Sequence, residues 1–365
     1  GVADRATVLL EAPFFASPDF PGVKQDTATI HGQSSGIGAG VEGPCVCGYQ
    51  SGGLVLISFF GNSVLSNSVG VFVAQAFGEL KNDDSRIAFG IQADIVGPRN
   101  PTVVNWGLIG GGGNTGFLRG QIRYERFFRP TCDRQWTLTV GISDPAPTNL
   151  AALLPEVAFS GSNGWPNVEG RAALGLGCEY QDGLEVRRPL EVGLSGMIGE
   201  IRTNLPDVIV PDPPLPPIPE PVIVSAIDDA WYAGVDVRWA ITDCFGVQGE
   251  IFAGQGLGTY SGGVLQTIDT ATFRTVRSRG GWGEVYWYWK PRLHSHVGYG
   301  VDDPRNADLN DPGERTLNEV YFANLMWDVT SNFQVAFEYS HWNTDYIVLP
   351  DAEANVYHFR MQYAF

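Results

Sequence analysis

Strict two-residue alternation at the C-terminal end restricts the fold of this chain more than any other feature. From residue 357 onward, one parity holds large apolar side chains, namely Tyr357, Phe359, Met361, Tyr363 and Phe365. The other parity holds His358, Arg360, Gln362 and Ala364. Successive side chains of a β-strand point to opposite faces, so the segment is predicted to be a strand with one apolar and one polar face.

The same alternation recurs through most of the chain. Val335, Phe337 and Tyr339 alternate with polar residues, and a tight link at 330–332 joins them to the alternating run at 321–327. Further runs lie at 86–95, 118–128, 135–142, 167–179, 190–198, 231–251 and 285–301. About fourteen strands are predicted in this way, beginning near Gly53. An additional strand within residues 1–50 stays open, because that region lacks clear periodicity.

Loop length alternates as well. Short turns at 290–292 and 329–332 are interleaved with long loops at 302–315 and 343–352. Barrels that span the bacterial outer membrane have short turns at one end and long loops at the other, and their strands alternate apolar-out and polar-in. A soluble sandwich has no need of this asymmetry. The pattern therefore favours a transmembrane β-barrel.

Composition excludes several other classes of protein. The 365 residues carry a net charge of −17, which argues against nucleic acid as a partner. Hydrophobic residues make up 44% of the chain, too many for a disordered protein. The sequence contains no run of eighteen apolar residues, so a transmembrane helix is not predicted. The chain opens at Gly1 without a charged and apolar leader, and we expect any signal peptide to have been removed.

Taken together, the alternation, the loop asymmetry and the terminal FRMQYAF segment resemble those of bacterial outer-membrane porins. Within that family the chain is most similar to the DcaP-like trimeric porins, through the segments DSRIAFGIQADIVG and WTLTVGISDP. The resemblance implies a homotrimer in the bacterial outer membrane, in contact with lipid and lipopolysaccharide. It also implies a water-filled channel for passive diffusion of small hydrophilic solutes and ions, with the third external loop folded into the pore.

The predicted fold is thus all-β, a transmembrane antiparallel barrel of about 14–18 strands, with 16 favoured because single-chain barrels have even numbers. Residues 51–365 are predicted to form the barrel domain. Residues 1–50 are predicted to be a periplasmic extension, a first strand or a plug. The outward parity of the last strand, formed by Tyr357, Phe359, Met361, Tyr363 and Phe365, would anchor it in the membrane.

The resemblance also suggests a constriction. The loop at 144–165 would fold into the barrel, with Asp144 and Glu156 as its acidic members. Arg119 and Arg123 share one face of a strand and would oppose these acids as an arginine ladder. The other inward residues predicted to line the pore are Arg86, Arg171, Arg238, Arg360 and Glu125. Alternatively, these arginines pair with acidic neighbours on the wall, such as Glu125, Glu169 and Glu250. DcaP-like relatives are associated with small anionic, dicarboxylate-type solutes, which an arginine cluster would suit.

Five cysteines stand at 45, 47, 132, 178 and 244, all near the predicted periplasmic end. Cys132 and Cys178 fall on neighbouring elements and are the best-placed pair for a disulfide, which that compartment permits. No cofactor and no metal is expected. The one calcium candidate is the acidic loop with Asp308, Asn310 and Asp311, although Pro312 breaks the spacing of a calcium hand.

Two other functions remain open from the sequence. One is an outer-membrane barrel enzyme, such as a lipid hydrolase, which would need serine and histidine together on the lipid-facing wall. The other is a secreted acidic, β-rich adhesion or binding protein, which would be soluble without detergent. The proline-rich segment at 206–221 and the glycine-rich segment at 110–116 are both interpreted as loops between strands.

Overall fold

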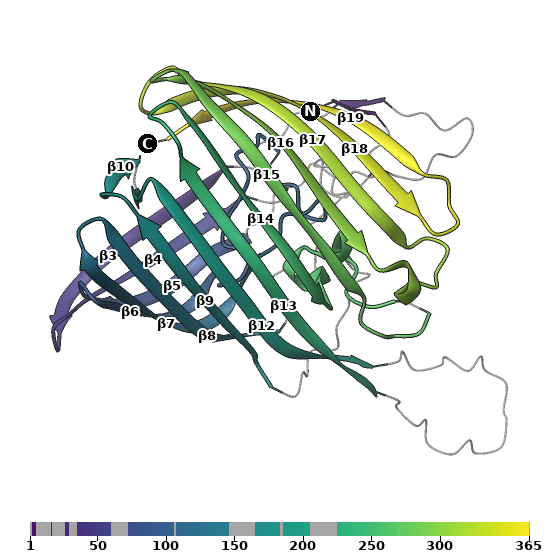
Figure 1. The fold of residues 1–365 in the computed structure, drawn as a ribbon, viewed down its shortest axis with the longest axis horizontal. Helices are drawn as coiled ribbons and strands as arrows, with labels where there is room; N and C mark the ends of the chain where they lie inside the picture. Colours follow the sequence, from purple (N-terminus) through teal and green to yellow (C-terminus); the bar gives the residue numbers. More distant parts are fainter. Residues whose placement is uncertain are drawn as a thin grey trace.

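The computed structural model describes residues 2–4, 16, 26–28, 35–59, 72–105, 107–145, 165–182, 185–204, 225–269 and 271–364. It is an all-β structure in which fifteen long antiparallel strands and two three-residue strands form one curved sheet. Figure 1 shows the strands tilted and wrapped around a common interior. The predicted fold class is confirmed. The sequence favoured sixteen strands, whereas the described residues form fifteen long strands and two short ones in this sheet.

The first half of the sheet comprises β3 (Gly36–Val46), β4 (Tyr49–Ser58), β5 (Phe72–Lys81), β6 (Ser85–Ala93), β7 (Leu118–Thr131), β8 (Arg134–Ser143) and β9 (Asn167–Leu176). The second half comprises β12 (Leu190–Asn204), β13 (Ser225–Ala240), β14 (Phe245–Gln255), β15 (Arg277–Lys290), β16 (Leu293–Pro304), β17 (Arg315–Asp328), β18 (Phe333–Tyr346) and β19 (Ala352–Tyr363). The remaining elements are β1 (Val2–Asp4), β2 (Asp26–Ala28), the hairpin β10 (Tyr180–Asp182) and β11 (Glu185–Arg187), and the 3₁₀ helices η2 (Leu257–Tyr260), η3 (Gly263–Leu265) and η4 (Asn306–Asp308).

Neighbouring strands follow the order of the chain. β3 to β9 pair in sequence, β9 pairs with β12 across the small β10–β11 hairpin, and β12 to β19 continue the sheet. β1 then pairs with both β19 and β2. Among the described residues no ladder joins β2 to β3, so the sheet is not closed at that seam. The described residues also include no helix that is long and apolar enough to cross a membrane.

Connections alternate between short and long along most of the sheet, as the sequence predicted, but the loop predicted at 343–352 is reduced to residues 347–351, because β18 continues to Tyr346. Short turns follow β3, β5, β7, β13, β15 and β17, and longer connections follow β4, β6, β8, β12, β14 and β16. We call the two ends of the sheet the short-turn end and the long-loop end. Figure 1 shows the short turns gathered at one end of the tilted strands.

The two parities of each strand have opposite exposure. On β19, Phe359, Met361 and Tyr363 are about three-fifths exposed, whereas Val356 and His358 of the other parity are buried. Over the part of each strand nearer the short-turn end, the outward parity is mostly apolar. Near the short-turn end it carries a ring of exposed tryptophans, namely Trp136, Trp239, Trp287, Trp289 and Trp327. An apolar outer band edged by aromatic residues is typical of a barrel in a bilayer. Tyr357 shares the outward parity, and Phe365 lies outside the described residues.

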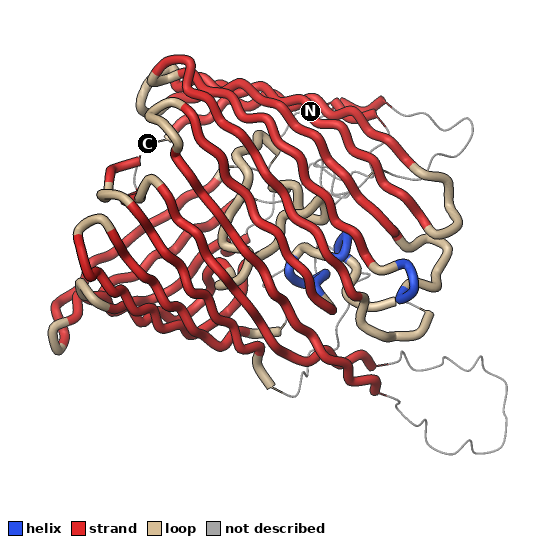
Figure 2. Tube along the Cα trace, in the orientation of Figure 1, coloured by secondary structure: helices blue, strands red, loops and turns tan. Residues whose placement is uncertain are grey.

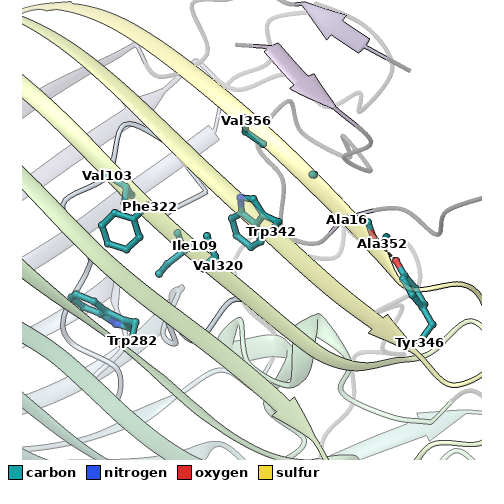
Figure 3. Packing of buried hydrophobic residues seen from close by; sticks show 11 residues of the cluster. Ala16, Val103, Ile109, Trp282, Val320, Phe322, Trp342, Tyr346, Ala352 and Val356 are labelled. Atoms are coloured by element: carbon teal, nitrogen blue, oxygen red, sulfur yellow. Dashed lines mark hydrogen bonds between the residues drawn. The ribbon is translucent and has the colours of Figure 1, made fainter. Parts of the chain in front are cut away.

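The predicted domain boundary at residue 50 cuts through the β3–β4 hairpin, whose ladder runs from Gly36–Ser58 to Val46–Tyr49. β3 reads GIGAGVEGPCV, and its glycines hide the alternation that reveals a strand. Ala16 also belongs to the barrel interior, because its amide donates to Oγ1 of Thr344 at 2.8 Å and its carbonyl accepts from the Tyr346 hydroxyl (Figure 3). The described part of residues 1–50 thus contains the short strands β1 and β2, the long strand β3 and the start of β4.

Candidate functional site

The connection between β6 and β7 folds into the interior of the barrel. We call residues 94–117 the inward loop. Ile95, Val96, Val104 and Ile109 of this loop are each at most 6% exposed, although they belong to no strand or helix. Figure 2 shows loop segments lying between the two walls of strands, where this connection runs. The loop divides the space that the sheet encloses.

Acidic side chains of the wall hold the inward loop by its backbone. Glu169 on β9 accepts a hydrogen bond from the Ile95 amide at 2.8 Å. Glu284 on β15 accepts from the Thr102 amide at 2.8 Å. Glu338 on β18 accepts from the Val104 amide at 2.6 Å and from the Asn105 amide at 3.1 Å. Glu250 on β14 accepts from the amide of Thr115 at 3.2 Å. Each carboxylate therefore satisfies amides that a loop inside a barrel would otherwise bury unpaired.

The glycine-rich part of the inward loop lies directly on the wall. Gly113 has a φ of +101°, and a Cβ built there would be 2.2 Å from the carbonyl oxygen of Gly281 on β15. A Cβ on Gly300 of β16 would be 2.1 Å from the carbonyl oxygen of Gly112. Asn318 on β17 donates from Nδ2 to the Gly111 carbonyl at 2.7 Å. The segment at 110–116 needs glycine because two backbones meet there without room for side chains.

An apolar cluster reinforces this attachment. Val103 and Ile109 of the inward loop pack with Trp282 of β15 and with Val320 and Phe322 of β17 (Figure 3). The cluster continues to Trp342 on β18, which is fully buried. These inward positions would be expected to be polar in a simple water-filled barrel, so their apolar character marks the area that the loop covers.

Arg119 is wholly buried and does not face an open lumen. Its Nε and Nη2 donate to the two carboxylate oxygens of Asp94, at 2.5 and 3.1 Å. Nη1 donates to the Asp144 carbonyl at 3.1 Å, and Nη2 donates to the Thr259 carbonyl at 2.8 Å. The guanidinium carbon lies 3.7 Å from the ring centroid of Tyr260. The predicted pore residue instead joins the inward loop, the start of the β8–β9 connection and η2.

The other predicted wall arginines keep partial access to the lumen. Arg86 binds Glu79 and Glu125, and Arg123 lies 3.7 Å from Glu125. The Arg86, Arg123 and Glu125 side chains are 13–14% exposed. This row matches the alternative in which wall arginines pair with acidic neighbours, with Glu125 as predicted. Glu169 and Glu250 hold the inward loop instead.

A second group of charges surrounds Asp236 on β13. Arg171 donates to it at 2.7 Å, and Arg99 of the inward loop donates to it at 2.9 Å. Both arginines also bind Glu191 at 2.8 Å. Arg99 could not be predicted as a member of this group, because it lies outside the alternating strand segments. Arg360 donates to Oε1 of Gln334 at 2.9 Å.

A cavity of about 1150 Å³ opens between the inward loop and the short-turn end. Thr102 of the loop lies at its boundary, and Arg238, Gln248, His294 and His296 line it from the wall. Nε of Arg238 is buried without a hydrogen-bond partner in the described structure. Arg187 and Lys290 add further positive charge, against Glu179 and Asp243.

Comparison with solved structures identifies the architecture. The outer-membrane channel DcaP of Acinetobacter baumannii matches with a TM-score of 0.72 and 14% identity, over 100% of this chain and 94% of that chain. The chain has the fold of an outer-membrane porin. No protein-family model and no curated protein matches it.

Two other outer-membrane proteins of known structure share this fold. The anion-selective porin from Comamonas acidovorans matches with a TM-score of 0.58 and 9% identity, over 100% of this chain and 96% of that chain. The trimer form of OmpT, an outer-membrane protein of Vibrio cholerae, matches with a TM-score of 0.51 and 11% identity, over 93% of this chain and 95% of that chain.

The constriction loop predicted at 144–165 is largely outside the described residues, which omit 146–164 and with them Glu156. Asp144 is described, and its carbonyl accepts from Arg119. Among the described residues, the preceding long connection, the inward loop, lies inside the barrel. In the sequence, only the glycines at 110–113 together with Asn114 and Thr115 distinguish this connection, and that pattern predicts no more than a loop between strands.

The predicted disulfide is not formed, because the thiols of Cys132 and Cys178 are both free and exposed. A guanidinium joins the two turns instead. Nη1 of Arg188 donates to the carbonyls of Cys132 and Gly177, at 2.9 and 2.6 Å, and Nη2 donates to Glu179 at 2.8 Å.

The side chains of the calcium candidate bond to neighbouring groups of the chain. Arg277 binds both carboxylate oxygens of Asp308 and holds the pKa of that carboxyl below its usual value. Nδ2 of Asn310 donates a hydrogen bond to Oδ2 of Asp269 at 3.1 Å. Oδ1 of Asp311 accepts from the Gly313 amide at 2.9 Å. In the described parts of the chain, no three His, Cys, Asp or Glu side chains gather around a common point that would suit a metal ion.

Proposed function

We propose that this chain is an outer-membrane porin through which small hydrophilic solutes and ions diffuse passively. The observation that carries the proposal is the combination of an apolar outer face with an ionisable inner face around a cavity of about 1150 Å³. A barrel of this strand number encloses water rather than a packed core. The inward loop would then set the width of the path.

The proposed assembly is a homotrimer in the bacterial outer membrane, with the short-turn end in the periplasm. The fold shared with DcaP and with the trimer form of OmpT supports this arrangement. At the long-loop end, Trp231, Arg277, Arg279 and Arg305 border a second hollow of about 540 Å³. Guanidinium groups above an apolar band are suited to lipopolysaccharide phosphates, which we propose as the lipid partner there.

Small anionic solutes of the dicarboxylate type are the proposed preference. Support comes from Arg238, whose buried Nε lacks a partner, and from Arg187 and Lys290 around the same cavity. Guanidinium is always charged and binds carboxylates in a bidentate manner. Likeness to an anion-selective porin is consistent with this preference.

The solute preference can be tested at one residue. Arg238→Gln is expected to shift the reversal potential in a salt gradient towards cation selectivity and to slow the entry of succinate into proteoliposomes. Arg279→Gln is the matched control, because that side chain is 78% exposed and pairs with Asp303 away from the cavity. Equal reversal potentials for the wild type and Arg238→Gln would rule out a role for this residue in selectivity.

Channel function itself is tested by liposome swelling with neutral sugars of increasing size. A porin admits the small sugars and excludes the large ones, and empty liposomes admit neither. Phospholipid hydrolysis in the same preparations would favour the enzyme alternative instead. That alternative needs histidine on the lipid-facing wall; His294, His296 and His358 are buried at inward positions, and His341, on the outward parity of β18, bonds to Asn355.

A further inference from the structure

The outer face of β18 and β19 is polar at a depth where other strands are apolar. His341 on β18 and Asn355 on β19 each lie eight residues from the short-turn end of their strand, and both belong to the outward parity. The outward residues at the same count on β8 and β12 are Ile142 and Ile198, and both are exposed. Equal counts along the strands of one tilted sheet give similar depths in a bilayer, so the imidazole and the amide lie within the apolar band.

A hydrogen-bonded group of side chains surrounds Asn355. Its Oδ1 accepts from the Tyr339 hydroxyl at 2.7 Å and lies 3.0 Å from Nδ1 of His341. Tyr357 packs on Tyr339 with ring centroids 5.2 Å apart. These contacts use only part of the bonding capacity, because an amide nitrogen has two hydrogens and an imidazole has two ring nitrogens. Among the described residues, Nδ2 of Asn355 and Nε2 of His341 have no hydrogen-bond partner.

The polar side chains continue onto β17 and β16. Tyr321 of β17 is paired with His341 in the ladder, and its ring centroid lies 4.7 Å from that of Tyr299 on β16. The Tyr299 hydroxyl donates to Glu319, a further outward residue of β17. We call this surface the polar outer patch, and it comprises Tyr299, Glu319, Tyr321, Tyr339, His341, Asn355 and Tyr357.

Lipid tails cannot satisfy these groups. They offer no hydrogen-bond donor or acceptor, and ionisable side chains of membrane proteins face other protein or water instead. Polar side chains join membrane-embedded segments through hydrogen bonds between them. Tyrosine is enriched in protein interfaces, because its ring packs while its hydroxyl bonds. The polar outer patch therefore suits contact with a protein surface at the same depth.

We propose that a second copy of this chain covers the polar outer patch. The inference rests on the homotrimer of the proposed function and locates one of its contact surfaces. In a ring of three copies, each chain contacts its two neighbours through two different surfaces. A neighbouring barrel is the protein surface that a homotrimer brings to this depth, and it would supply partners for Nδ2 of Asn355 and Nε2 of His341.

Photo-cross-linking in outer membranes tests this surface directly. The photoreactive residue p-benzoylphenylalanine, placed at Tyr321 or Tyr357, is expected to give covalent dimers and trimers of the chain on a denaturing gel. Both tyrosines are about half exposed. The matched control carries the same group at Ile198, an exposed outward residue of β12, which β13–β18 separate from β19. The control should stay a single chain.

A double variant tests the hydrogen bonds of the patch. His341→Leu/Asn355→Leu should lower, by several degrees, the temperature at which the detergent-purified trimer separates into single chains. Leucine is at least as compatible with lipid as the residues it replaces, so the barrel should still fold. Glu200→Leu removes an outward polar side chain of β12 and should leave the dissociation temperature unchanged. An unchanged or higher temperature in the double variant would contradict the proposal.

Cross-links to lipid or lipopolysaccharide alone from both tyrosine positions, or equal yields of chain dimers from all three positions, would also overturn it. Conduction is measured in the same preparations. A conducting protein whose chains do not cross-link at the patch refutes this surface and leaves the proposed porin function standing. Folded protein that cross-links at the patch but passes no current refutes the porin function and leaves the contact surface standing.

Discussion

Excision of residues 98–114, with a Gly-Ser-Gly bridge in their place, is expected to raise the single-channel conductance several-fold. Conductance is set by the narrowest part of a pore, and the inward loop crosses the interior between β9 and β18. The ends of the cut are close together, since a Cβ on Gly97 would lie 2.4 Å from the Thr115 carbonyl oxygen. The bonds from Ile95 to Glu169 and from Thr115 to Glu250 would remain.

A single substitution tests how the inward loop is held against β18. Glu338→Ala removes the acceptor of the Val104 and Asn105 amides and should increase current fluctuations. Glu338→Gln keeps one carbonyl acceptor and should have a weaker effect. Glu353→Gln makes the same change at an exposed position on β19 and should have none. Unchanged conductance after the excision would show that the inward loop does not limit the pore.

Replacement of Arg119 by alanine is expected to cost about 3–5 kcal/mol of unfolding free energy, because it leaves the Asp94 carboxylate buried without its partner. Both side chains are 0% exposed. The measurement is urea unfolding in lipid or detergent, followed by tryptophan fluorescence. Arg123→Ala, on the same face of β7 but partly exposed, should cost much less.

The paired variant separates lost charge pairing from lost packing. Arg119→Ala with Asp94→Asn removes both charges, so it should be more stable than the sum of the two single losses predicts. Additive losses would mean that the pair contributes no coupling, and that Arg119 acts only through its contact with Tyr260 and its bonds to backbone carbonyls.

Strand positions could be predicted where one face meets lipid and the other meets polar groups. β17 and β18 are examples, since their alternation and the 330–332 turn define the hairpin directly. β3 could not be found in this way, because glycine at every second or third position leaves no side-chain pattern. The alternation is a local signal, and it fails where side chains are missing.

The site was harder to predict because its contacts are long-range. Parity correctly places Arg119 and Arg123 on the inner face of β7, but it does not reveal that another segment covers one of them. That segment has no periodicity, and its partners Glu169, Glu250, Glu284 and Glu338 are distributed over four strands. A row of inward glutamates opposite a glycine-rich connection is the pattern that would have indicated it.

The central claim is that this barrel conducts, and single-channel recording in a planar lipid bilayer tests it most directly. Detergent-purified wild-type protein is predicted to give stepwise, ohmic currents, grouped in threes, with an anion-selective reversal potential in a salt gradient. Protein that is folded and inserted, as judged by protease protection and circular dichroism, yet passes no current would contradict the account.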